Sequence, residues 1–315
     1  MPTDAKHIPV EPNADVRFIK LGDGGIWESS CIEDNTLRLG YESPFHDDAL
    51  RGNWDAVREF WLNFRKGDKR VASSDVSQIR DFYELPDTAV WITFFRRRMY
   101  WCRAKPEVIK LEDETRVRKA TPNWSSCDIH GSPLTIENID GRVTKVQGYR
   151  GTICRVEMNG YLIRKINGET QPEVEVARQS LKKLRIDMEE LIRGLWWNDF
   201  ELLVELIFSK SGWQRISVLG KTEKDIDMDM FSPVTQRRAF VQVKSSTSQA
   251  EISGYYDSFK EYTEYNEMYF VFHTLKGRLG DAPIGAERLH LWDISRVAEL
   301  VIQAGLVDWL ITKRS

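Results

Sequence analysis

Apolar and polar residues follow two different patterns along the chain, and the pattern changes near residue 168. Before that point, short runs rich in β-branched and aromatic residues alternate with Gly, Pro, Asn and Asp, which predicts strands and turns. The expected strands are 89–95, 98–104, 151–158 and 161–166, and one helix is expected over 47–67, ended by Gly67. Residues 1–168 are therefore predicted to form a small, mainly-β domain resembling a barrel, with one or two helices.

The second half favours helices and strands in alternation. Residues 169–180 are interpreted as a linker that runs into a helix, and 181–315 as a second domain. Apolar residues at helical spacing predict helices over 173–195, 198–212, 254–265 and 294–311. Strand-like runs occupy 214–220, 225–231, 239–245, 267–274 and 288–293. This order is typical of an α/β layout around a mixed sheet.

Composition narrows the class of protein. The 315 residues are 41% hydrophobic and 30% charged, and no apolar run reaches the length of about 18–20 residues that spans a bilayer. The first residues lack the features of a secretion signal, so a cytoplasmic protein without membrane contact is expected. The four cysteines form no CxxC pair and the five histidines are dispersed, which gives no support to zinc or Ser-His-Asp chemistry. A net charge of −3 argues against a uniformly basic surface and leaves room for a local basic patch.

Three carboxylates share one face of a predicted strand. Asp225, Asp227 and Asp229 alternate with apolar residues, so all three project to one side. The segment SPVTQRR is read as a turn, after which the chain returns as AFVQVKSS on a neighbouring strand. A hairpin of this kind would bring the acidic strand beside Gln242 and Lys244.

The returning strand carries polar residues that a core strand does not need. Gln242 and Lys244 are two apart and project from the same face, and a lysine facing a sheet interior is costly unless it is paired or functional. A carboxylate together with the Val243 carbonyl could bind a hard divalent cation, with Lys244 left to orient a water molecule. Glu201 on the preceding helix could complete the site, and Glu205, one turn on, is its rival.

The segment NDFELLVELIF…SGW…KDIDMDM…FVQVKSS resembles the Mrr-type branch of the PD-(D/E)XK nuclease superfamily, which has the restriction-endonuclease fold. The resemblance implies a catalytic set of Glu201, Asp227, Gln242 and Lys244, and metal ligands drawn from Asp227, Val243, Glu201 and Asp229. The family often shows Asp-x-Gly-x-Asp, whereas this chain has Asp-Ile-Asp-Met-Asp. Asp227 is preferred as the metal ligand with Asp229 as its rival, and Asp225 is read as a strand-entry residue. Two alternatives stay open: an exposed acidic strand face that pairs with Lys244, and a retained fold that has lost catalysis.

The N-terminal half places aromatic residues beside basic ones. The run VWITFFRRRMYWCRAK is typical of a surface that contacts phosphates and stacks bases, although Trp and Tyr in strands are usually core and turn arginines are usually solvated. This half is also similar to EVE-like domains of the PUA superfamily, which implies a pocket for a flipped, often modified base. The candidate nucleic-acid or base contacts are Trp27, Trp91, Arg96, Arg97, Arg98, Tyr100, Trp101 and Trp124.

Together these features predict an endodeoxyribonuclease that uses Mg²⁺, with Mn²⁺ as a substitute, on double-stranded DNA that carries modified bases. The resemblance implies a modification-dependent restriction enzyme in anti-phage defence. Cutting both strands requires two sites, so a homodimer is expected, with residues 294–311 as core or dimer surface. The alternatives are a nuclease switched on by a small nucleotide bound to the N-terminal domain, and a nucleic-acid binding protein with a relic nuclease fold.

Overall fold

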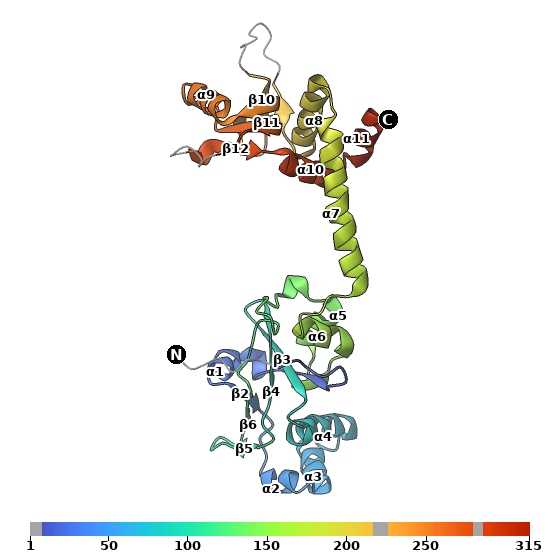
Figure 1. Cartoon of the computed structure of the whole chain (residues 1–315). Coiled ribbons are helices and arrows are strands. Elements are labelled where there is room, and N and C mark those ends of the chain that lie inside the picture. Colours follow the sequence, from blue (N-terminus) through green and yellow to red (C-terminus); the bar gives the residue numbers. More distant parts are fainter. Residues whose placement is uncertain (1–7, 217–225, 280–285) are drawn as a thin grey trace. The chain divides into compact units, whose positions relative to one another are not determined.

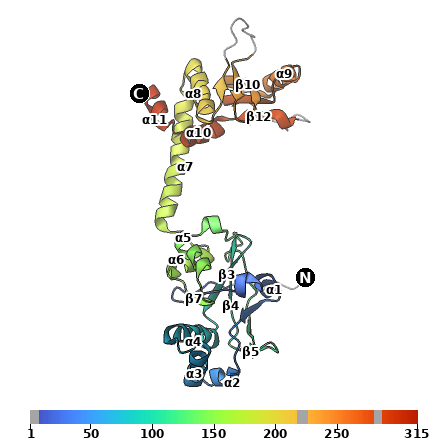
Figure 2. The ribbon, with the colours of Figure 1, turned by 180° about the vertical axis from the view of Figure 1, so that it is seen from behind.

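The structure is a computed structural model that describes residues 8–216, 226–279 and 286–315. The chain divides into two compact units, Met1–Gln171 and Pro172–Ser315 (Figures 1 and 2). Each unit has its own sheets, helices and core. Within the described ranges, no helix has the length and apolar character that crossing a membrane requires.

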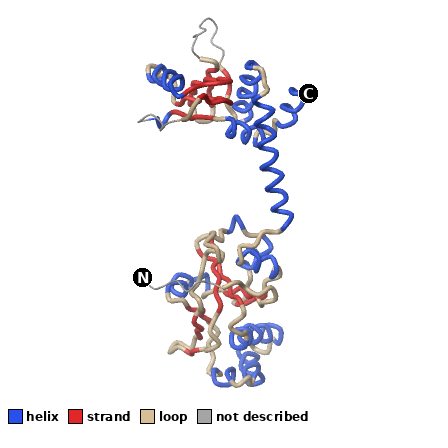
Figure 3. The backbone as a smooth tube through the Cα atoms, viewed as in Figure 1, coloured by secondary structure: helices blue, strands red, loops and turns tan. Residues whose placement is uncertain are grey.

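Two open sheets and several short helices make up the N-terminal unit (Figure 3). One sheet has the order β4-β3-β1-β7 and the other β2-β6-β5. The strands are β1 (Val16–Ile19), β2 (Thr36–Leu39), β3 (Val90–Phe95), β4 (Arg98–Arg103), β5 (Ile109–Lys110), β6 (Arg116–Lys119) and β7 (Ile153–Arg155). The helices are α1 (Glu28–Glu33), α2 (His46–Leu50), α3 (Trp54–Phe64), α4 (Lys69–Glu84), α5 (Gly141–Thr144) and α6 (Asn159–Ile166), with 3-10 turns at Asp23–Gly25, Ile136–Asn138 and Lys145–Gly148.

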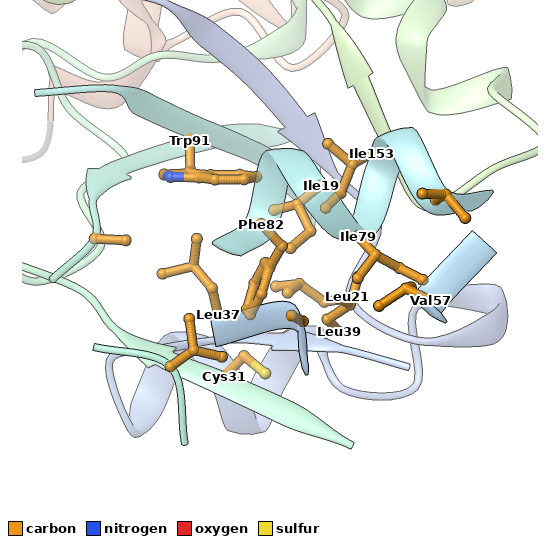
Figure 4. Packing of buried hydrophobic residues seen from close by; sticks show 14 of the residues in the cluster. Ile19, Leu21, Cys31, Leu37, Leu39, Val57, Ile79, Phe82, Trp91 and Ile153 are labelled. Carbon is orange, nitrogen blue, oxygen red and sulfur yellow. The ribbon is translucent and has the colours of Figure 1, made fainter. Parts of the chain in front are cut away.

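Helix α4 joins the two sheets through a shared core. Ile79 and Phe82 of α4 pack with Ile19 of one sheet and with Leu37 and Leu39 of the other (Figure 4). All five side chains are at most 5% exposed. Burial of this size is the main source of stability in a domain of this length.

The prediction of a barrel for this unit is wrong. The described strands form two separate open sheets. Helix α4, which packs against both, was not expected because its buried face includes the polar residues Asp75 and Gln78. Residues 161–166 were expected as a strand but lie in α6, where Leu162, Ile163 and Ile166 are buried at helical spacing. The helix expected over 47–67 is two helices, because the chain turns at Gly52 with φ of 74°.

A five-stranded mixed sheet forms the centre of the C-terminal unit, as predicted, in the order β12-β11-β10-β9-β8. The strands are β8 (Gln214–Arg215), β9 (Met228–Ser232), β10 (Arg237–Ser248), β11 (Glu267–Lys276) and β12 (Leu289–Trp292). The helices are α7 (Pro172–Arg193), α8 (Trp197–Lys210), α9 (Gln249–Lys260), α10 (Ile294–Gln303) and α11 (Val307–Arg314), with a 3-10 turn at Ala286–Arg288. Strand β10 is antiparallel to β9 and parallel to β11.

Helices cover both faces of this sheet (Figure 1). Ala239, Val241 and Val243 of β10 pack in the cluster shared with α7, α8 and α10, while Phe240 packs with α9 on the other face. The single helix expected over 294–311 is two helices, α10 and α11, separated at Gly305, which has φ of 68°. Strand β10 is thus enclosed between two helical layers, and a polar residue on it needs a partner.

Candidate active site

The carboxylate of Asp227 is fixed by two consecutive residues of β10. The backbone N–H of Val243 donates a hydrogen bond to Asp227 Oδ2 at 2.7 Å, and the side-chain amide of Gln242 donates to the same oxygen. The pairing of β9 with β10 ends at Met228 opposite Val241, so Asp227 lies just beyond the last paired residue. The Asp227 side chain therefore satisfies a backbone donor that β9 no longer reaches.

The two residues that hold this carboxylate each carry an oxygen atom as well. The N–H and C=O groups of a strand residue point to the same edge of the strand, so the Val243 carbonyl shares the edge at which its N–H meets Asp227. Gln242 is 1% exposed, and its Oε1 is buried with no hydrogen-bond partner in the described part of the chain. A buried carbonyl oxygen without a donor favours a ligand that supplies positive charge.

Lys244 reaches the same place from the α9 side of the sheet. Its Nζ lies 5.2 Å from the centroid of the Tyr255 ring. Burial acts to lower the pKa of Lys244, but a hydrogen bond to Tyr255 and the charges of Asp227 and Glu251 outweigh it, and the pKa is raised. Lys244 is therefore an ammonium ion at neutral pH and places a positive charge beside Asp227.

Glu201 of α8 supplies a second carboxylate from the opposite helical layer. Burial raises the pKa of Glu201, and the nearby charge of Asp227 raises it further. Burial also raises the pKa of Asp227, against the opposing effects of the Val243 N–H, Lys244, Gln242 and Arg215. Because both carboxyl groups are half-buried and close together, ionising both costs free energy. A bound cation would offset this cost by stabilising the two ionised carboxylates.

Both rival carboxylates are held by arginines. Glu205 forms an ion pair with Arg215 at 2.6 Å, and Arg215 also donates to the backbone oxygen of Asp227 at 3.1 Å. Asp229 forms an ion pair with Arg238, away from Gln242 and Val243. Asp225 lies outside the described residues. Of the acids considered, Asp227 and Glu201 are the two with no arginine bonded to the side chain.

The oxygen atoms gathered here suit a hard divalent cation. The described ranges contain no group of three or more His, Cys, Asp or Glu side chains that could hold a metal. A site at Asp227 would combine the carboxylates of Asp227 and Glu201 with the Val243 carbonyl. Mg²⁺ accepts such oxygen sets and keeps several water ligands, so few protein carboxylates are needed.

Most of the N-terminal candidates lie in the core or on a turn. Trp91 and Trp101 are 0% exposed and Trp124 is 8% exposed, so none of these rings can serve as a wall for a base. Their aromatic character reflects packing. Arg96 and Arg97 form the turn between β3 and β4 with positive φ, Arg98 follows as an exposed residue, and Tyr100 is half-buried. Only Trp27, of these eight candidates, lines the large cavity of this unit.

A family model matches most of the C-terminal unit. A model of the restriction endonuclease family of the Mrr type matches residues 192–301. Residues 192–301 are a restriction endonuclease domain. This match confirms the predicted resemblance and the predicted class of enzyme, a DNA endonuclease.

Two further comparisons, with solved structures and with curated proteins, give no information beyond the match to the restriction endonuclease family. A search of solved structures finds the DNA modification-dependent restriction endonuclease AspBHI, at 10% sequence identity and a TM-score of 0.29, over 88% of this chain and 79% of that one. At that score the likeness carries no conclusion about this chain. No curated protein matches the sequence. The resemblance of the N-terminal half to EVE-like domains is not confirmed.

Two neighbours of the site were not anticipated from the sequence. Arg215 links Glu205 to the backbone of Asp227, and Tyr255 contacts Lys244. Arg215 lies in a strand-like run and Tyr255 on an amphipathic helix. Both residue types are common in such elements, so nothing in the local sequence marked them as part of a site. Their roles depend on strand register and helix placement, which no local pattern encodes.

The raised pKa of Glu201 predicts a pH-dependent gain in stability for Glu201→Gln. A carboxyl whose pKa is raised on folding contributes stability below its unfolded pKa, about 4.3 for glutamate, and loses that contribution as pH rises through the folded pKa. Without divalent cations, Glu201→Gln should therefore raise the urea midpoint of the C-terminal unit at neutral pH and leave it unchanged at acidic pH. Amide exchange of β10 and β11 gives this midpoint.

Glu205→Gln is the matched control, because it removes an ion pair with Arg215 and should not stabilise the unit. Equal effects of the two substitutions at every pH would contradict the assigned electrostatics of Glu201.

Proposed function

We propose that this chain is a Mg²⁺-dependent endonuclease of double-stranded DNA, with Mn²⁺ able to replace Mg²⁺. The observation that carries the proposal is the Asp227 carboxylate bonded by Gln242 and Val243, beside a buried amide oxygen without a partner, in a restriction endonuclease domain. Asp227 and the Val243 carbonyl would hold the metal, and Glu201 would complete its coordination directly or through water. When bound, the metal supplies a Lewis acid for the phosphodiester and a water molecule of lowered pKa.

The other residues of the site position the metal ligand and the attacking water, and they stabilise the charge that develops on the phosphate. Gln242 keeps the Asp227 carboxylate in one orientation through its amide N–H. Lys244, protonated at neutral pH, orients the attacking water and faces the negative charge that grows on the phosphate oxygens as the new P–O bond forms and the old one breaks. Tyr255 restricts the Lys244 side chain to this position. The burial of these groups strengthens each interaction.

We further infer that the enzyme restricts foreign DNA, including phage DNA, that carries modified bases. The support is the combination of a restriction endonuclease domain with a separate compact unit that contains its own large cavity. In the alternative, that unit binds a small nucleotide signal which switches cleavage on. Cleavage of plain and modified DNA, each with and without free nucleotides, separates the two.

A homodimer is proposed because a break in both strands needs two active sites. Helix α10 does not provide the contact through its apolar face, since Val297, Ala298 and Val301 are at 0% exposure in the core of their own unit. The first half of α7 is a better candidate. It leaves the body of the C-terminal unit (Figures 1 and 2), and all of its residues up to Lys183 are exposed.

Helix α7 carries a heptad repeat along its whole length. The apolar positions of the repeat are Val174, Ala177, Leu181, Leu184, Met188 and Leu191, and Leu195 continues the spacing just past the end of the helix at Arg193. Met188 and Leu195 are buried in their own unit, whereas Val174 is 41% and Leu181 50% exposed. A free helical segment of this length is marginal in water, and an a/d stripe is stabilised by the same stripe of a second copy. A parallel pairing would also place Glu173 of one copy beside Arg178 of the other.

Loss of the Lys244 charge should abolish cleavage and spare DNA binding. Lys244→Met is expected to slow Mg²⁺-dependent cleavage by about 100-fold or more, as removal of one charge-stabilising group does in other hydrolases. Lys260→Met, which removes an exposed lysine from α9, is the control and should cleave at the wild-type rate. Undiminished cleavage by Lys244→Met would contradict the role proposed for Lys244, whereas no Mg²⁺-dependent cleavage by the wild-type chain would support the relic-fold alternative.

The dimer contact predicts a contrast between two double variants. Val174→Lys with Leu181→Lys places charge on the a/d stripe and should give a monomer in sedimentation velocity. Val176→Lys with Ile186→Lys changes residues that are more exposed, at 62% and 52%, but lie off the stripe, and should leave a dimer. If both variants sediment as the wild type does, α7 is not the dimer contact.

A further inference from the structure

The N-terminal unit contains a cavity of about 840 Å³, within the range of small-molecule sites. It is formed by four segments: the loop after β1, the residues after β2, helix α4 with the turn before it, and the loop before β7. Its lining includes Trp27, Tyr41, Arg70, Gln78, Tyr149 and Arg150. No part of it belongs to the restriction endonuclease domain.

Glycines hold two aromatic rings of the cavity in place. A Cβ atom on Gly40 would lie 3.1 Å from the Trp27 ring, and one on Gly151 would lie 2.6 Å from the Tyr149 ring. The guanidinium of Arg38 lies 4.3 Å from the centroid of the Trp27 ring. These close approaches restrict both rings, so the cavity offers flat aromatic surfaces that need little reorganisation on binding.

The buried polar residues of the cavity wall are already committed to structure. Asp75 is 5% exposed and accepts hydrogen bonds from Tyr41 at 3.1 Å and Arg65 at 2.6 Å. Gln78 accepts from the backbone N–H groups of Thr152 at 2.7 Å and Ile153 at 2.9 Å. These bonds tie α4 to the segment after β2 and to the loop before β7, and so they fix the shape of the wall.

The unused charges lie at the rim. The side chains of Arg70, Arg150, Asp23 and Glu42 line the cavity and make no hydrogen bond or ion pair within the described part of the chain. The lining as a whole is balanced, with four cations (Lys20, Arg65, Arg70 and Arg150) and four acids (Asp23, Glu42, Asp68 and Asp75). A polyphosphate would be repelled by the acids as much as it is attracted by the cations. A ligand with one phosphate and a ring that donates hydrogen bonds fits better, because two arginines can bind the phosphate and two carboxylates can accept hydrogen bonds from the ring.

We propose that this cavity binds a single nucleobase with its one phosphate. The base stacks on the Trp27 or Tyr149 ring, Asp23 and Glu42 accept hydrogen bonds from its donors, and Arg70 and Arg150 bind the phosphate. Two sources share this chemistry: a base extruded from DNA and a free mononucleotide. The DNA source rests on the proposed endonuclease function, and the free nucleotide does not.

The test uses the full chain with Lys244→Met and without divalent cations, so that DNA binding is measured without cleavage. Its affinity is measured for duplexes that contain one unmodified, methylated, hydroxymethylated or glucosylated cytosine, and for free nucleoside monophosphates. Arg70→Gln with Arg150→Gln should weaken binding of the preferred ligand about tenfold or more, because two charge-assisted hydrogen bonds are lost. Arg51→Gln with Arg58→Gln, an exposed pair that does not line the cavity, is the matched control and should bind as the parent does.

The outcomes separate the two sources. Tighter binding of one modified duplex, not displaced by mononucleotides, assigns a base in DNA, and binding of a mononucleotide alone assigns a free ligand. Equal affinities of the cavity variant and the control variant for every probe would overturn the proposal. A Trp27→Ala variant tests the aromatic surface in the same binding assay, and it should bind the preferred ligand more weakly than the parent does.

Failure here is distinct from failure of the proposed function. Metal-dependent cleavage by the Lys244-containing chain is measured on the same DNA, so an active nuclease with an unaffected cavity variant rejects the cavity site alone. An inactive nuclease whose cavity binds a mononucleotide rejects the endonuclease function alone.

Discussion

A hydrogen bond from the Val243 N–H to the Asp227 carboxylate sets the geometry of the candidate active site in the C-terminal unit. It forms where β9 stops pairing with β10, so a side chain completes the hydrogen bonding that the backbone leaves unfinished. The same contact brings the carboxylate beside the Val243 carbonyl and the Gln242 amide. The end of a strand thus becomes a cluster of oxygen atoms, with Glu201 of helix α8 on one side of the sheet and Lys244 of β10 on the side that α9 covers.

These groups would bind a cation favourably, and without a cation their burial costs free energy. Burial raises the pKa of both Asp227 and Glu201, and the Gln242 oxygen has no donor. Arg215 and Lys244 offset part of the negative charge, but Arg215 is bonded to Glu205 and to backbone rather than to the Asp227 side chain. Groups held in this way are typical of functional sites, where stability is lower than the fold would otherwise allow.

The sequence predicted the nuclease half better than the N-terminal half, for physical reasons. Gln242 and Lys244 are visible as polar residues at strand period in an apolar run, and the helix that bears Glu201 has a clear apolar stripe. The choice between Asp227 and Asp229 depends on strand register and on Arg238, which lies nine residues away. In the N-terminal unit, Trp91 and Trp101 look the same whether they form a pocket or a core, and only packing shows that they are core. Helix α4 escaped detection because its buried face contains Asp75 and Gln78, whose partners come from distant segments.

Binding of Mn²⁺, followed by electron paramagnetic resonance of the full chain near neutral pH, tests the central claim most directly. The account predicts one site per chain in the wild type, its loss in Asp227→Asn, and its retention in Asp229→Asn, whose carboxylate is paired with Arg238. Retention of the site in Asp227→Asn together with its loss in Asp229→Asn would contradict the account.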